Sequence, residues 1–93
     1  MSADEVDWMR RVSQRYPVPA ALLRYALAAG LNGRPDEAAA TLGRLCKMHA
    51  PARCDEGRVA WAELQGRYPE LRAIVAPPTA LPAAPVNKAR TNG

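Results

Sequence analysis

The sequence has 93 residues, enough for one small domain. Its composition is 48% hydrophobic without any phenylalanine, and 13 basic residues nearly balance nine acidic ones, for a formal charge of +4. This charge balance is weak evidence for an anionic partner. No apolar run is long enough to span a membrane or resembles a signal peptide.

The first predicted helix ends at about Arg15. Asp7 and Arg11 are four residues apart, a spacing at which side chains pair on the outer face of a helix. Val18 lies between two prolines, which favour an extended backbone after the helix. The apolar side chains form one stripe with Trp8 beside it: Val6, Met9, Val12 and Tyr16.

The second and third predicted helices form an antiparallel hairpin. The second begins near Pro19 and ends at Asn32-Gly33, because glycine accepts the positive φ found just past a helix end. The third runs from Pro35 to about Met48, with proline in the first turn. Gly43 inside this helix predicts a close approach of a neighbouring helix, since glycine otherwise weakens a helix.

The fourth predicted helix runs from about Cys54 to Arg67, and residues 70–75 form one last turn. Helical spacing places its largest apolar side chains on one face. The predicted core combines residues of the helices and of the segments that end them: Leu23, Leu27, Leu31, Leu42, Leu45, Trp61, Leu64, Tyr16 and Tyr68.

This pattern predicts an all-α fold, a four-helix stack similar to tetratricopeptide repeats, with a helix, a helix hairpin and a helix over residues 2–75. The sequence Arg-Tyr-Pro ends two helices, at residues 15–17 and 67–69, and in both the tyrosine is expected to tuck under the helix end. Residues 76–93 are rich in proline and alanine and then polar, which predicts a disordered tail.

Two cysteines flank the connection between the third and fourth helices. A disulfide between Cys46 and Cys54 would contribute about 2.5 kcal/mol and would imply an oxidising compartment such as a periplasm. Two alternatives stay open: buried free thiols, and a zinc site with His49, which lacks a fourth ligand. We favour the disulfide and interpret His49 as a residue facing the end of a helix.

No catalytic constellation stands out in the sequence. Ser13 is placed on a polar helix face without a base at motif spacing, and residues 30–33 end a helix rather than forming a phosphate loop. We therefore predict neither a catalytic residue nor a cofactor or metal.

A candidate basic face of the hairpin, suited to glycan phosphates, lipid headgroups or an acidic peptide, comprises Arg24, Tyr25, Arg34, Arg44 and Lys47. The alternative is an ordinary solvated helix surface.

Several segments together resemble one family, the C-terminal domain of the bacterial O-antigen polymerase and ligase superfamily, in the branch of the pilin-type protein O-oligosaccharyltransferases. The resemblance covers residues 5–75. It rests on Arg-Tyr-Pro-Val-Pro-Ala-Ala-Leu-Leu-Arg-Tyr-Ala-Leu (15–27), Asn-Gly-Arg-Pro-Asp-Glu-Ala (32–38), Leu-Cys-Lys-Met-His (45–49), Cys54, Trp61 and Arg-Tyr-Pro-Glu-Leu (67–71).

The resemblance implies a polytopic inner-membrane enzyme that transfers glycan from an undecaprenyl-diphosphate carrier to an acceptor such as serine or threonine of a pilin-like protein. The family's catalytic residues lie in membrane and loop regions that this chain lacks, so none is carried over. The implied role is a non-catalytic domain on the periplasmic side of the inner membrane. Its expected partners are the rest of the enzyme, an acceptor protein or the lipid-linked glycan.

Two other functions stay open. The chain could be a free-standing tetratricopeptide-like interaction module, for which two free thiols would be expected. It could also be a small basic nucleic-acid binder, which predicts an affinity that falls steeply with salt. The even spread of acidic residues makes the second alternative the weaker one.

Overall fold

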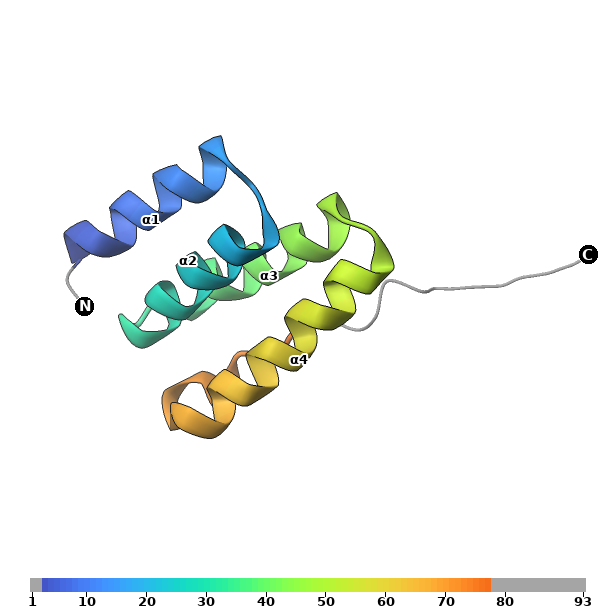
Figure 1. Ribbon diagram of the computed structural model, residues 1–93. Helices are drawn as coiled ribbons and strands as arrows, with labels where there is room; N and C mark the ends of the chain where they lie inside the picture. The colour runs from blue at the N-terminus through green and yellow to red at the C-terminus, as the bar shows by residue number, and fades with distance from the viewer. Residues whose placement is uncertain (1–2, 78–93) are drawn as a thin grey trace, which may run out of the picture.

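The chain is all-α over residues 3–77, the part that a computed structural model describes. Its elements are α1 (Ala3–Arg15), α2 (Pro19–Leu31), α3 (Pro35–Met48), α4 (Pro51–Arg67) and a 3-10 turn, η1 (Pro69–Ala73) (Figure 1). The predicted all-α fold is confirmed. Residue 2 of the predicted domain and residues 78–93 of the predicted tail lie outside the described residues.

Proline marks the start of every element after α1. Pro19, Pro35 and Pro51 begin α2, α3 and α4 at a constant interval of 16 residues, and Pro69 begins η1. Proline suits these positions because its fixed φ is helical and its missing N–H would have no partner in the first turn. The same rule corrects one boundary, because α4 begins at Pro51 and not at Cys54.

The turn between α2 and α3 forms as expected. Gly33 has a φ of 73°, and the next amide, of Arg34, donates to the Ala29 carbonyl at 2.9 Å. The side chain of Asn32 also donates to the Ala28 carbonyl at 2.9 Å. These bonds satisfy carbonyls at the end of α2 and reverse the chain into an antiparallel hairpin.

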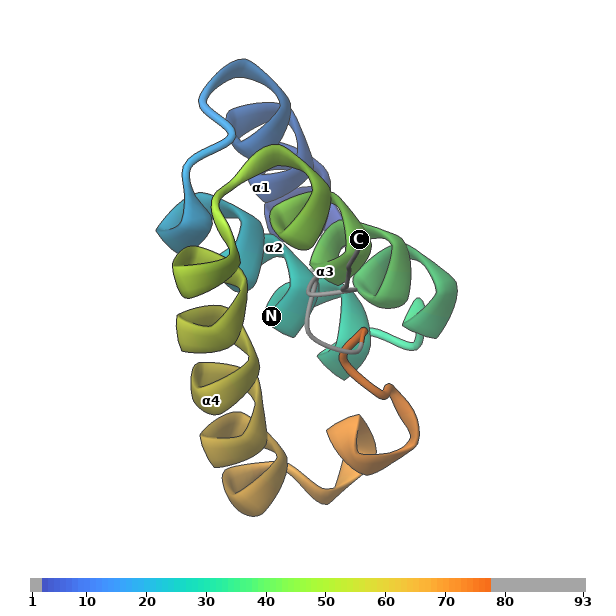
Figure 2. The same cartoon turned by 90° about the vertical axis from the view of Figure 1, so that its right-hand side faces the viewer.

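Helix α2 lies at the centre of the stack. It contacts α1, α3, α4 and η1, and α1 and α4 lie on different sides of it (Figures 1 and 2). The main core cluster gathers around it: Val6, Tyr25, Ala26, Ala28, Ala29, Ala38, Leu42, Trp61, Leu71 and Ile74.

The buried face of α2 differs from the predicted leucine row. Leu23, Leu27 and Leu31 are only partly buried and pack against the edge of the core. The fully buried positions include Leu22, Ala26, Ala28 and Ala29. Helix α2 is contacted from several sides, and the alanines let its neighbours approach closely. Leu64 and Tyr68 are likewise partly buried, whereas Leu42, Leu45 and Trp61 are buried as predicted.

The C-terminal end of the stack is closed by η1. Leu71 and Ile74 fold back onto Gly30 of α2, where a Cβ atom would lie 2.5 Å from Leu71 Cδ2. The indole N–H of Trp61 donates to the Ile74 carbonyl at 2.8 Å, and the Gln65 amide donates to the carbonyls of Leu71 and Ile74, both at 3.1 Å. The segment of η1 and Ile74 therefore packs against both α2 and α4.

The two Arg-Tyr-Pro segments have different environments, so the shared expectation for them is wrong at the first. Tyr68 is partly buried and packs against the core, whereas Tyr16 is 58% exposed, with Arg15 over its ring. The expectation for Gly43 is also wrong: within the described residues nothing lies within 4 Å of the place where its Cβ would be.

Candidate functional site

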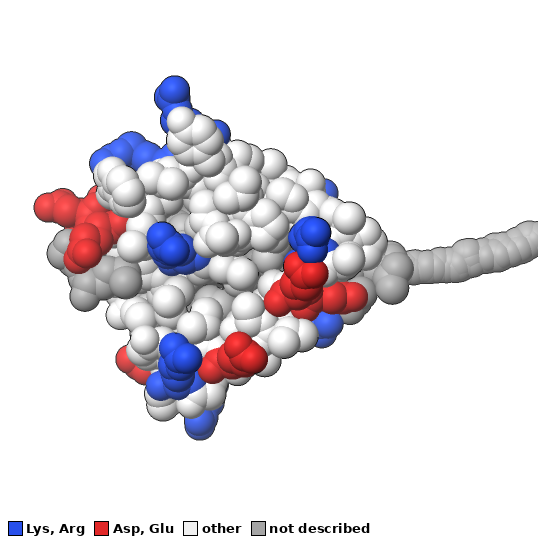
Figure 3. Space-filling view, in the orientation of Figure 1, with Lys and Arg blue, Asp and Glu red and all other residues white. Residues whose placement is uncertain are grey.

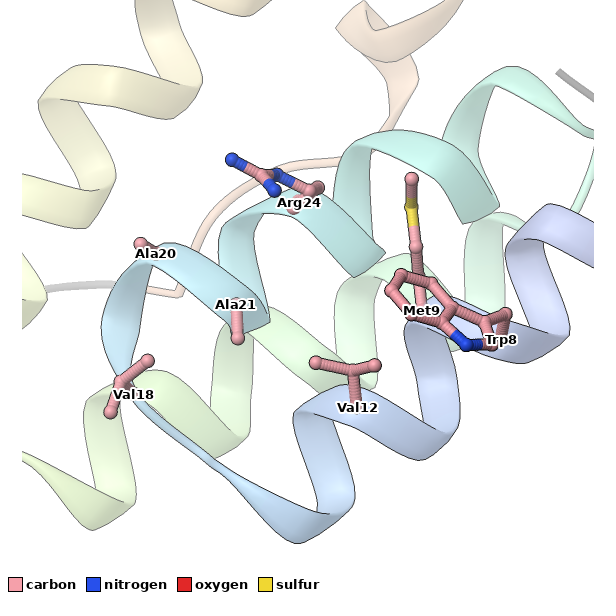
Figure 4. A pocket seen from close by; sticks show the side chains of 7 residues that line it. All are labelled: Trp8, Met9, Val12, Val18, Ala20, Ala21 and Arg24. Carbon is pink, nitrogen blue, oxygen red and sulfur yellow. The ribbon is translucent and has the colours of Figure 1, made fainter.

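An apolar groove lies between α1 and α2. Trp8, Met9 and Val12 of α1 form one wall, and Ala20, Ala21 and Arg24 of α2 form the other, with Val18 of the connecting segment closing one end (Figure 4). The hollow has a volume of about 260 Å³. It is therefore large enough to receive side chains from another molecule.

Local sequence explains how the groove arises. The first turn of α2 carries two neighbouring alanines, Ala20 and Ala21, and their small side chains leave space between α2 and α1. Val18 is extended, with φ −81° and ψ 154°, as its position between two prolines predicts, and this backbone holds its side chain at the end of the groove.

The groove exposes large apolar side chains to solvent. Trp8 is 59% exposed and Val18 is 51% exposed. Exposed aliphatic residues are common singly, but an exposed tryptophan beside other apolar groups marks contact surfaces in many proteins. This groove is therefore the strongest candidate for a binding surface in the described part of the chain.

Arg24 supplies the charge of the groove. It is the only charged residue of α2, and no carboxylate of residues 3–77 lies within ion-pair distance of it. In Figure 3 a broad uncharged area crosses the face over α1 and α2, and most charged side chains lie at its margins. The groove thus combines an apolar floor with one uncompensated positive charge.

The five residues predicted as a basic face have different surroundings. Tyr25 is buried, and its hydroxyl donates to Glu37. Arg34 binds Asp7 at 3.0 Å and lies 3.8 Å from Glu37. Arg44 contacts the Met48 sulfur at 3.8 Å on α3, and Lys47 is exposed near the end of that helix. Only Arg24 of the five lines the groove.

The Arg34 guanidinium joins the hairpin turn to α1 through Asp7. Its hydrogen bond lowers the pKa of Asp7 below the ordinary value of 3.8, and the carboxylate in turn raises the pKa of Arg34. Asp7 also lies 3.8 Å from Arg10, so it pairs with these two residues instead of with Arg11 as predicted. This ion pair helps to place α1 against the hairpin.

The Tyr25 hydroxyl contacts Glu37 between α2 and α3. Burial raises the pKa of Tyr25 to about 12, and the hydrogen bond to the Glu37 carboxylate contributes in the same direction. A tyrosine held in its protonated form in this way serves as a structural hydrogen-bond donor.

Cys46 and Cys54 lie together at the junction of α3 and α4. Their sulfur atoms are at the bonding distance of a disulfide, with the Cα atoms 4.6 Å apart. The Nε2 atom of His49 lies 2.7 Å from the Pro17 carbonyl oxygen. Within residues 3–77 no group of three or more His, Cys, Asp or Glu side chains could hold a metal ion.

Ser13, which we expected on a polar helix face, is fully buried. Its hydroxyl donates to the Arg10 carbonyl at 2.8 Å, so the polar atom is satisfied within its own helix. The groove itself was not predicted from the sequence. Two signals in the sequence could have indicated it. One is the pair of neighbouring alanines at the start of α2, and the other is Trp8, which lies beside the predicted apolar stripe of α1.

Comparisons with protein-family models, with curated proteins and with solved structures found no match for this chain. In the described part of the chain, none of the helices is long and apolar enough to cross a membrane.

Proposed function

We propose that this chain is a non-catalytic, periplasmic docking domain of a polytopic membrane O-oligosaccharyltransferase or O-antigen ligase, which transfers lipid-linked glycan to serine or threonine of an acceptor protein. The domain holds a protein partner: the acceptor or another part of the enzyme. The observation that carries the docking role is the apolar groove between α1 and α2, with its exposed Trp8.

The helical architecture supports a docking role. Successive helices begin 16 residues apart, close to half of the roughly 34-residue tetratricopeptide period. Proteins built from such helix pairs commonly bind other proteins on their exposed helix faces. A tetratricopeptide-like stack is the architecture that we propose for this chain.

The cysteine pair supports the periplasmic location. Disulfides form and persist in oxidising compartments and are rare in the cytosol. Cys46 and Cys54 are placed to form one, and the segments that resemble the glycosyltransferase family include both cysteines. The same two cysteines thus support both the location and the resemblance.

The test is made in the cell that produces this chain. An antibody against residues 3–77 should detect a membrane-bound product that protease reaches from the periplasmic side of spheroplasts. Deleting the codons for residues 3–77 in frame should then reduce glycan transfer or change which proteins are glycosylated. Unchanged glycosylation of every acceptor would refute the proposal.

A second outcome would favour the alternative function. A cytosolic product that contains only this chain, with two thiols that alkylating reagents modify, would indicate a free-standing interaction module. The groove would then serve a cytosolic partner.

A further inference from the structure

We propose that the groove between α1 and α2 binds a short peptide segment that inserts an apolar side chain beside Trp8 and places a carboxylate against Arg24. This inference rests on the proposed docking role and names the chemistry of the partner.

The volume of the groove favours a peptide side chain over a free small molecule. Binding sites for small molecules have volumes of about 300–1,000 Å³ and enclose most of their ligand. The groove has about 260 Å³ and lies open between two helices. A cavity of about 150 Å³ already accepts a benzene ring, so this one holds a large apolar side chain or two smaller ones.

The walls of the groove favour an apolar anchor. Met9 and Val12 are partly buried behind the exposed Trp8, and Val18 closes the end. Methionine adapts its shape to different partners, and a tryptophan gives a large contact area at a small cost in conformational entropy. An inserted leucine or aromatic side chain would bury apolar area on both sides.

The charge of the groove selects the polar group of the partner. Arg24 stands at its rim and, within residues 3–77, has no acidic partner. An arginine fork matches a carboxylate with two parallel hydrogen bonds. A segment with an aspartate or glutamate near its apolar anchor therefore complements the groove in both respects.

Two other occupants fit the charge less well. Residues 78–93 of this chain contain Lys88 and Arg90 and no acidic residue, so they would bring positive charge to Arg24. A second copy docked groove to groove by two-fold symmetry would bring two Arg24 side chains to one interface. A carboxylate-bearing segment of another protein, or of another part of the same enzyme, avoids both conflicts.

The experiment selects ligands without assuming a sequence. A library of displayed random 12-residue peptides is selected on the full chain with its disulfide intact, and the enriched peptides are synthesised for calorimetric titration. Selection should enrich peptides with apolar residues near aspartate or glutamate. Trp8→Ala should weaken their binding at least tenfold, because exposed aromatic anchors dominate such interfaces.

Charge reversal provides the specific control. Selection on Arg24→Glu should replace the acidic residues of the enriched peptides by lysine or arginine, whereas selection on Lys47→Glu should leave them acidic. Lys47 is the matched control because it is exposed on α3 and does not line the groove. Circular dichroism of each variant establishes that it is folded.

Several results would overturn the inference: no enriched peptide, peptides that bind Trp8→Ala as well as the wild type, or an acidic preference that survives in Arg24→Glu. Self-association that Trp8→Ala abolishes would overturn it too, because the occupant would then be a second copy. If deletion of residues 3–77 alters glycan transfer while no acidic peptide is selected, this inference fails and the proposed function stands.

Discussion

The two ends of the helical stack differ in how deeply they bury the same types of aromatic residue. Trp61, at the C-terminal end, is 1% exposed and donates its indole N–H to the Ile74 carbonyl, whereas Trp8, at the N-terminal end, is 59% exposed. The tyrosines of the two Arg-Tyr-Pro segments follow the same division, with Tyr68 packed against the core and Tyr16 in solvent.

The difference follows from what comes after each helix. After α4 the chain folds back as η1 and covers Trp61 with Leu71 and Ile74. After α1 it passes through Val18 into α2, and no element of the described chain covers Trp8. One end of the stack is therefore closed by its own sequence, and the other leaves apolar side chains exposed.

The two tryptophans provide the sharpest test of this comparison. Trp61→Ala should lower the free energy of unfolding by about 3–5 kcal/mol, because it leaves a large cavity and removes one of the two hydrogen bonds to the Ile74 carbonyl. Trp8→Ala should change it by no more than about 0.5 kcal/mol, because its side chain is already largely in water. Urea unfolding followed by circular dichroism measures both.

If Trp61→Ala does not fold, Trp61→Phe takes its place. This variant keeps an aromatic ring but loses the hydrogen bond, and it should still be clearly less stable than Trp8→Phe. Equal losses for the matched pair would show that the two ends do not differ.

The cysteine pair reinforces the closed half of the stack. A disulfide that joins residues eight positions apart should contribute about 2.5 kcal/mol, because it restricts the unfolded chain. The intact mass under non-reducing conditions should be two hydrogens below that of the dithiol. Urea unfolding with and without reductant then measures the loss, and the double variant Cys46→Ala, Cys54→Ala should not respond to reductant.

Two glycines test how tightly the stack is packed on each side. A Cβ at Gly57 of α4 would collide with the buried Leu45 side chain, so Gly57→Ala should destabilise the domain by about 1–2 kcal/mol. Gly43 of α3 has open space, so Gly43→Ala should stabilise it by up to about 1 kcal/mol through helix propensity. Thermal unfolding compares the two variants, and the same sign for both would contradict the packing described.

The hydrogen bond between Tyr25 and Glu37 joins α2 to α3, and its loss should have a small effect. Tyr25→Phe should cost about 1 kcal/mol at neutral pH. Because the pKa of Tyr25 rises to about 12 in the folded state from an ordinary value of 10.0, its stabilisation is complete below pH 10 and is lost as the pH rises toward 12. Urea unfolding at pH 8 and pH 11 should show a smaller gap between wild type and variant at pH 11.

Local signals in the sequence predicted the helices well. Pro19 and Pro35 mark helix starts and Gly33 permits the turn, because each acts through its own backbone geometry. Burial was harder to predict. Leu23, Leu27 and Leu31 were expected in the core but are only partly buried. Contacts on several sides of α2 instead bury Leu22, Tyr25 and three alanines.

The candidate site was predicted only in part. Arg24 was predicted as part of a basic face, and it lines the groove. Tyr25 and Arg34 were grouped with it, but Tyr25 is buried and Arg34 pairs with Asp7. The groove depends on how two helices lie against each other, which no spacing within one helix encodes. The same limit explains the two Arg-Tyr-Pro segments. The burial of each tyrosine depends on the element that follows it, which is α2 in one case and η1 in the other.

The unequal burial of the two tryptophans gives the protein two built-in optical reporters. The emission of an indole shifts to shorter wavelengths away from water, so Trp61 reports on closure by η1 and Trp8 reports on occupancy of the groove. Quenching by acrylamide should affect Trp8 and spare Trp61 while the domain is folded. Binding at one end and opening at the other can therefore be followed separately in an unlabelled molecule.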